Sequence, residues 1–69
     1  MKFDYVPNSE LSAAIDEYVK GSNNRKIMKD RYIDYLTFQQ LADRYNYTVR
    51  QIQYIVHKGE TQLFKHLKI

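Results

Sequence analysis

Apolar residues recur at helical spacing along most of the chain. In its first third they stand at i, i+3, i+4, i+7 and i+8, which predicts an amphipathic helix from residue 8 or 9 to about residue 20. Pro7 disfavours helical geometry in the residue before it, and Gly21 is a common helix stop. We therefore expect a leader over residues 1–7 whose apolar side chains can pack on the domain. The buried stripe of the helix is expected to be Leu11, Ala14, Ile15, Tyr18 and Val19.

Three more helices are predicted by the rest of the pattern. They are expected over about residues 25–35, over 38–45, and from 49 to about 66. Thr37 is a favourable cap for the third helix, since its hydroxyl can accept from a free amide at the helix start. The chain is rich in tyrosine, and most of these rings are expected to pack in the core with their hydroxyls at the surface. These tyrosines are Tyr5, Tyr18, Tyr32, Tyr35, Tyr45 and Tyr47.

Gly59 raises the question of how far the last helix extends. A glycine costs about 1 kcal/mol inside a helix, and the apolar spacing continues through this position. We therefore predict one long helix to about residue 66, with or without a kink at Gly59, where the glycine marks a helix end or a packing accommodation. The alternative is a break there and a fifth short helix over residues 60–67. Either way, the fold class is an all-α single domain over residues 8–69.

Residues 38–57 have the spacing of two short helices joined by a tight turn. Asn46 tolerates the left-handed conformation that turns the chain, and Thr48 is a good cap for the second of these helices. Small Ala42 lets a second helix cross close by. This combination is typical of a helix-turn-helix. The expected motif core is Leu41, Ala42, Tyr45, Ile52 and Ile55.

The polar residues of this motif suit contact with DNA. In the major groove, Arg pairs with guanine and Gln with adenine, while Tyr54 could contact a thymine methyl group or a phosphate. Arg50, Gln51, Gln53 and Tyr54 lie in the first turns of the second motif helix, so they are the predicted base-contacting residues. The predicted phosphate contacts are Thr37, Gln39, Gln40, Thr48, His57 and Lys58, with Lys26, Lys29 and Arg44 as weaker candidates.

The charge distribution favours the same interpretation. The formal net charge of the chain is +3. Residues 1–19 hold one Lys and four acidic residues, a net of −3, whereas residues 20–69 hold ten Lys or Arg and four acidic residues, a net of +6. The basic part contains the motif, as expected of a domain that neutralises phosphates. A solubilising helical surface would explain the same charge.

Several short runs carry a family likeness: Tyr35-Leu36-Thr37, Gln40-Leu41-Ala42, Tyr45-Asn46-Tyr47-Thr48, Arg50-Gln51-Ile52, Leu63 and Leu67. Together they resemble region 4 of bacterial sigma factors and the related small helix-turn-helix regulators of phages and mobile elements. LuxR-type output domains are the second match. The resemblance implies a compact helical domain whose second motif helix enters the major groove; in sigma factors this domain reads the upstream promoter element and contacts RNA polymerase. The chain departs from the pattern by lacking a companion domain and by carrying Asn46 where the family often has glycine, so we do not expect a complete sigma factor.

The sequence contains no recognisable motif for catalysis, metal binding or nucleotide binding. There is no cysteine, the two histidines are nine residues apart, and no glycine-rich phosphate loop is present. Asp30 and Asp34 share a helix face, but neighbouring Lys26 and Arg31 predict surface ion pairs. We therefore expect no enzyme, catalytic residue, metal, cofactor, small-molecule substrate or membrane span.

The sequence thus predicts a sequence-specific transcriptional regulator of bacterial, phage or mobile-element type that binds double-stranded DNA. It would be cytoplasmic and nucleoid-associated. Because one such module buries a modest interface, we expect a homodimer or a protein partner, with the acidic first helix as a candidate contact. The alternative is a protein-interaction module that docks on RNA polymerase or another regulator without contacting DNA.

Overall fold

The computed structural model describes residues 3 and 5–67. Within these residues helices are the only regular secondary structure: α1 (Asn8–Tyr18), α2 (Ser22–Tyr32), α3 (Phe38–Tyr45) and α4 (Val49–Leu67). This confirms the predicted all-α fold with a long C-terminal helix. The remaining positions of the predicted leader and domain, residues 1, 2, 4, 68 and 69, lie outside the described residues.

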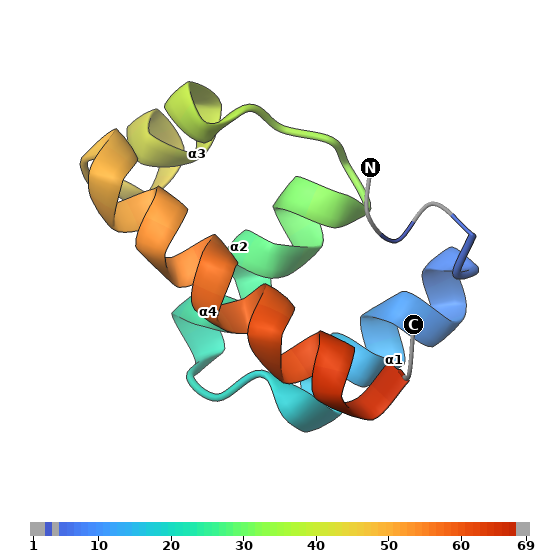
Figure 1. The fold of residues 1–69 in the computed structure, drawn as a ribbon. Helices are drawn as coiled ribbons and strands as arrows, with labels where there is room; N and C mark the ends of the chain where they lie inside the picture. The colour runs from blue at the N-terminus through green and yellow to red at the C-terminus, as the bar shows by residue number, and fades with distance from the viewer. Residues whose placement is uncertain (1–2, 4, 68–69) are drawn as a thin grey trace.

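The long helix α4 organises the molecule. It contacts each of the other three helices, with α3 beside its first turns and α1 beside its last turns (Figure 1). Its buried stripe faces the other helices and includes Ile52, Val56 and Leu63. The apolar core is completed by residues from every other helix and from the leader: Phe3, Leu11, Ala14, Ile15, Val19, Ile27, Met28, Tyr32, Leu41 and Ala42.

Gly59 lies inside α4, which runs without interruption as predicted. A Cβ atom at this position would lie 2.5 Å from Sδ and 2.9 Å from Cγ of Met28 on α2. Met28 is fully buried, so its side chain has little room to move away. The close approach of α2 to α4 therefore leaves no room for a side chain at position 59 unless Met28 shifts. Because α4 is continuous through Gly59, the alternative of a fifth helix is excluded.

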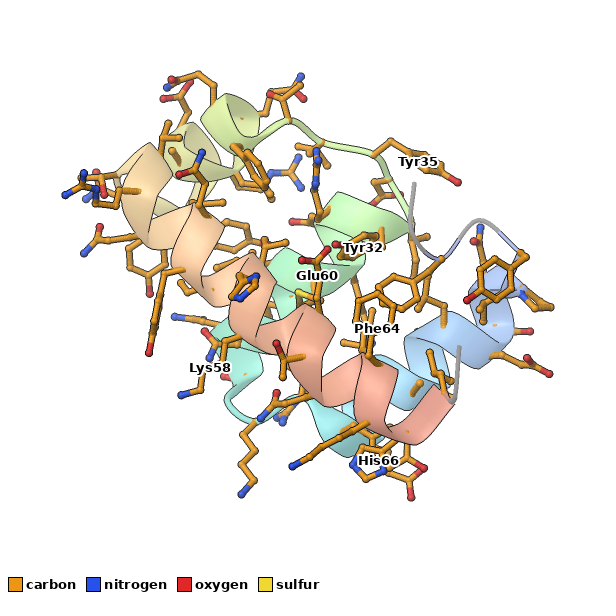
Figure 2. The ribbon with its side chains drawn as sticks, viewed as in Figure 1. Tyr32, Tyr35, Lys58, Glu60, Phe64 and His66 are labelled. Carbon is orange, nitrogen blue, oxygen red and sulfur yellow. The ribbon has the colours of Figure 1, made fainter. Side chains whose placement is uncertain are left out.

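The second helix is shifted from its prediction. It begins and ends three residues earlier than expected, because Gly21 takes a φ of 91° and its carbonyl accepts from the Arg25 N–H in the first turn. Tyr35 then follows the helix with a left-handed φ of 59°. This backbone directs Tyr35 outwards, where the residue is 54% exposed, so the predicted core role of Tyr35 was wrong (Figure 2). The same prediction was wrong for exposed Tyr5.

The leader packs on the domain through Phe3, as predicted. Its ring is buried and meets the Tyr32 ring edge-on with centroids 5.0 Å apart, and it also contacts Phe64 at 5.1 Å. Beneath this aromatic cluster the Tyr32 hydroxyl donates to the carboxylate of buried Glu60 (Figure 2). Burial, together with the hydrogen bond and the charge of Glu60, raises the pKa of Tyr32 well above its usual range.

Candidate nucleic-acid interface

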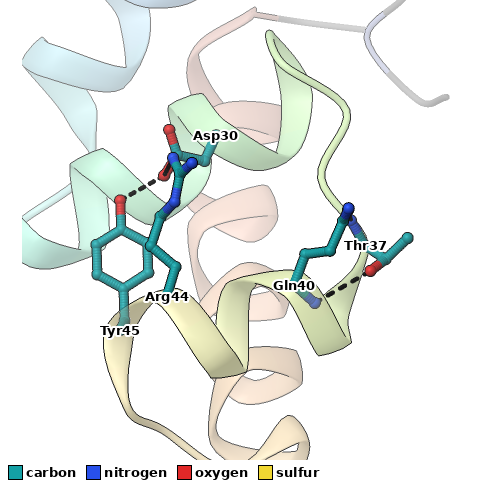
Figure 3. Close-up of polar contacts among 5 residues, drawn as sticks. All are labelled: Asp30, Thr37, Gln40, Arg44 and Tyr45. Carbon is teal, nitrogen blue, oxygen red and sulfur yellow. Dashed lines mark hydrogen bonds and ion pairs between the residues drawn. The ribbon is translucent and has the colours of Figure 1, made fainter.

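A reciprocal cap fixes the start of α3. The Gln40 N–H donates to Oγ1 of Thr37 at 3.1 Å, and the Thr37 N–H donates to Oε1 of Gln40 at 2.8 Å (Figure 3). This confirms Thr37 as the cap. The spacing Thr-x-x-Gln is the signal of such a capping box, and sequence analysis used only its threonine half. Thr37 and Gln40 are exposed, but a phosphate would have to share groups that the cap already engages.

The turn between α3 and α4 has the predicted geometry. Asn46 adopts the left-handed conformation, with φ 59° and ψ 43°, and the Tyr47 N–H donates to the carbonyl of Ala42 at 3.0 Å. A second reciprocal cap follows: the Gln51 N–H donates to Thr48 Oγ1 at 3.1 Å, and the Thr48 N–H donates to Gln51 Oε1 at 2.9 Å. The direction in which α4 leaves the turn is therefore fixed by backbone and side-chain bonds at every residue from 46 to 48.

Packing holds the two helices together. Leu41, Ala42 and Ile52 are buried, while Tyr45 and Ile55 are half-buried against the core. With a methyl group as its side chain, Ala42 allows α3 to lie close to α4. These five residues are the motif core that the sequence predicts, and all five are buried or half-buried against the common apolar core of the domain.

A polar cluster ties α3 to α2. The Tyr45 hydroxyl donates to Asp30, and Nη1 of Arg44 lies 3.3 Å from the same carboxylate (Figure 3). Burial, followed by the hydrogen bond and the charge of Asp30, raises the pKa of Tyr45 to about 12. The predicted ion pairs of Asp30 with Lys26 and Arg31 were wrong, because Arg44 and Tyr45 reach it from α3. Because the side chain of Arg44 is already paired with Asp30, Arg44 is a poor candidate for a phosphate contact.

The first turns of α4 present their polar side chains to solvent. Tyr54 is 66% exposed, and Arg50 and Gln53 are also exposed. His57 and Lys58 continue the exposed face in the next turn. Within residues 3 and 5–67, no hydrogen bond or ion pair engages any of these five side chains. Gln51 differs, since its side-chain oxygen belongs to the cap of Thr48.

Two hollows adjoin the flank of α4. The first, about 450 Å³, is lined by Tyr47, Tyr54, Ile55 and their neighbours Arg50 and Gln51. The second, about 410 Å³, shares Ile55 and lies between α4 and the α1–α2 loop. Its polar lining residues are Lys20, Asn24, Lys58 and Gln62. Among the residues that the structure describes, no carboxylate lines either hollow. Tyr47 is partly buried against the core, in line with its predicted packing. That Lys20 and Tyr47 also line hollows beside α4 was not predicted, because this depends on how the helices pack.

Acidic residues lie both on α3 and on α1. On α3, the carboxylate of Asp43 accepts from the side-chain amide of Gln39 at 3.1 Å. The helix α1 carries Glu10, Asp16 and Glu17, and this helix lies beside the last turns of α4, away from α3 (Figure 1). Lys29 is drawn into this acidic region, with its Nζ 2.7 Å from Asp16, so it is a poor phosphate candidate. The cationic side chains without a hydrogen bond or ion pair in the described part of the chain are Lys20, Lys26, Arg50, Lys58 and Lys65.

No group of three or more histidine, aspartate or glutamate side chains in the described part of the chain is placed to hold a metal ion. None of the helices there combines the length and the apolar character needed to cross a membrane. Comparison with known proteins finds no matching family model, no significantly similar curated protein and no significantly similar solved structure. The case for a function therefore depends on the chemistry of the α3–α4 surface.

Proposed function

We propose that α3, the turn over residues 46–48 and α4 form a helix-turn-helix that binds double-stranded DNA with sequence specificity. The chain would act as a transcriptional regulator of bacterial, phage or mobile-element type. One observation carries the proposal: the first turns of α4 expose Arg50, Gln53 and Tyr54, which have no hydrogen-bond or ion-pair partner among the described residues, on a helix whose start is fixed by a left-handed residue and a reciprocal cap.

The dimensions of this face suit the major groove. An α-helix with its side chains is about 10–12 Å across, and the major groove of B-form DNA is about 12 Å wide, so it admits one such helix. Arg50 can donate to both acceptors of a guanine, and Gln53 can pair with an adenine. His57 and Lys58 follow one turn later, where they can contact the phosphate backbone.

Gln51 has a different role in this proposal. Its Oε1 accepts from the Thr48 N–H, so paired recognition of adenine, which needs that oxygen as an acceptor, would break the cap. The amide nitrogen keeps its donors. We therefore propose that Gln51 positions α4 and offers at most a donor to a base or phosphate, while Arg50 and Gln53 carry the paired contacts.

An apolar hollow between Tyr47 and Tyr54 favours a second candidate function. Such a surface could accept an apolar side chain of RNA polymerase or another regulator, and the domain would then be a protein-interaction module. The two functions differ in their dependence on salt and on Arg50, since only a phosphate-binding surface releases counterions when it binds.

The test compares two variants of α4, in each of which alanine replaces one cationic residue. Arg50→Ala and Lys65→Ala each remove one exposed cation that has no partner within residues 3 and 5–67, but only Arg50 lies on the proposed base-contacting face. Duplexes selected from a random pool by the unmodified chain supply the binding site. In fluorescence anisotropy, Arg50→Ala should weaken binding by about 5- to 150-fold and relax the sequence preference at one position. Lys65→Ala should leave the sequence preference unchanged.

Equal losses in the two variants would indicate non-specific charge attraction and contradict the assignment of α4. Failure to select any duplex at low salt, together with retention of a protein partner, would favour the interaction module. Circular dichroism of both variants checks that the fold is retained.

A further inference from the structure

We infer that the hollow beside the first turns of α4 recognises the 5-methyl group of a thymine. This inference rests on the proposed function and specifies the base that the hollow accepts. Tyr47 and Tyr54 contribute aromatic surface and Ile55 contributes aliphatic surface, while Arg50 brings a cation to the same hollow. Tyr54 is one of the most exposed large apolar side chains in the described part of the chain.

The composition of the hollow selects its occupant. An apolar surface bordered by a cation and by no carboxylate matches a ligand that is anionic overall and has an apolar edge. DNA has this character, since phosphates flank its bases and the thymine methyl is the apolar group displayed in the major groove. The neighbouring hollow also suits an anionic ligand, because it shares Ile55 and places Lys20 and Lys58 on the same flank of α4. A purely apolar protein side chain would leave these cations unused.

The helix geometry also fixes where the thymine should lie. Arg50 and Tyr54 are four residues apart, so they lie one above the other on the same helix face, about 6 Å apart along its axis. Successive bases of a strand are about 3.4 Å apart. The thymine should therefore lie within about two base-pair steps of the base that Arg50 contacts.

Deoxyuridine substitution tests this inference, because uracil lacks only the methyl group and keeps the same pairing edge. The probe is the duplex selected by the unmodified chain, in which each thymine is replaced in turn. At the recognised position, replacement should weaken binding about three- to fivefold, as expected for losing one buried methyl group. The same replacement in the duplex should not change its binding by the Tyr54→Ala variant. The control Tyr5→Ala, which truncates an exposed tyrosine outside α4, should retain the full uracil penalty.

The outcomes separate this inference from the function on which it rests. Selective duplex binding with no sensitivity to uracil, or a selected site without an invariant thymine, would overturn the methyl recognition and leave the DNA-binding function standing. A uracil penalty that persists unchanged in Tyr54→Ala would also overturn it. If the free chain self-associates and Tyr54→Ala dissociates it, the hollow is a contact between two copies and the inference fails. Absence of duplex binding at low salt would remove both proposals.

Discussion

Replacing Gly59 by alanine tests the close packing on which the position of α4 depends. In a helix interior, alanine is more favourable than glycine by about 1 kcal/mol. At this site the new Cβ would lie 2.5 Å from Sδ, 2.7 Å from Cε and 2.9 Å from Cγ of fully buried Met28. Overpacking of this kind costs about 1–3 kcal/mol. The clash therefore cancels or exceeds the helical gain, and Gly59→Ala should lower the free energy of unfolding by up to about 2 kcal/mol.

A matched pair of variants isolates the packing contribution. Thr61 is exposed two residues further along α4, so a comparison of Thr61→Ala with Thr61→Gly measures helix propensity with little tertiary contact. Alanine should be favoured there by about 1 kcal/mol. A double-mutant cycle adds Met28→Ala, which should cost about 2–5 kcal/mol alone. In the Gly59→Ala background it should cost less, by about the 1–3 kcal/mol of the relieved clash.

Urea denaturation followed by far-ultraviolet circular dichroism provides the unfolding free energies. If Gly59→Ala stabilises the chain by the same amount as alanine at Thr61, and the cycle shows no coupling with Met28, then α2 does not constrain α4 at this position. The reasoning would be refuted.

Three further predictions concern the surroundings of the α3–α4 unit. Tyr32→Phe removes the hydroxyl that donates to buried Glu60 and should lower the unfolding free energy by about 1.5–3 kcal/mol, measured by urea denaturation; an unchanged midpoint would contradict the buried hydrogen bond. The pKa of Tyr45 is raised to about 12 in the folded chain, against about 10 in the unfolded chain. Protonated Tyr45 therefore stabilises the folded state fully below pH 10, and this contribution is lost as the pH rises towards 12. Stability should therefore fall over that window and fall less in Tyr45→Phe, as thermal melts at each pH would show; identical profiles would exclude this role of Tyr45. Asn46→Gly should be nearly neutral, whereas Asn46→Val should cost roughly 1–2 kcal/mol at the left-handed φ of 59°; equal stability of the two variants in chemical denaturation would contradict the turn geometry.

The predictability of the fold differs between local and non-local features. The bounds of α3 and the start of α4 were predicted to the residue, because caps, turn and apolar spacing all lie within a short segment. The shift of α2 was not predicted, since residues 22–24 have loop-like composition and the positive φ of Gly21 allows the helix to begin earlier. The requirement for glycine opposite Met28 and the pairing of Tyr32 with Glu60 depend on tertiary packing that sequence spacing does not specify.

The candidate site divides in the same way. The exposure of Arg50, Gln53 and Tyr54 follows from helical periodicity, so the sequence was sufficient to predict it. The use of Gln40 and Gln51 in caps had a visible signal, the repeated Thr-x-x-Gln, which the prediction interpreted only as capping by threonine. The hollows beside α4 could not be predicted, because they form where Lys20 and Tyr47 approach α4 from other segments.

The salt dependence of duplex binding is the most direct test of DNA recognition by α4. The measurement is the association constant for the selected duplex, by fluorescence anisotropy, across a series of salt concentrations. Each phosphate contact should contribute about −0.9 to the slope of log affinity against log salt. Lys58→Ala should make the slope less negative by about 0.9, while Arg50→Ala, if it contacts a base, should reduce affinity and discrimination with a smaller change in slope. A flat salt dependence, or no binding at low salt by a folded chain, would contradict the account.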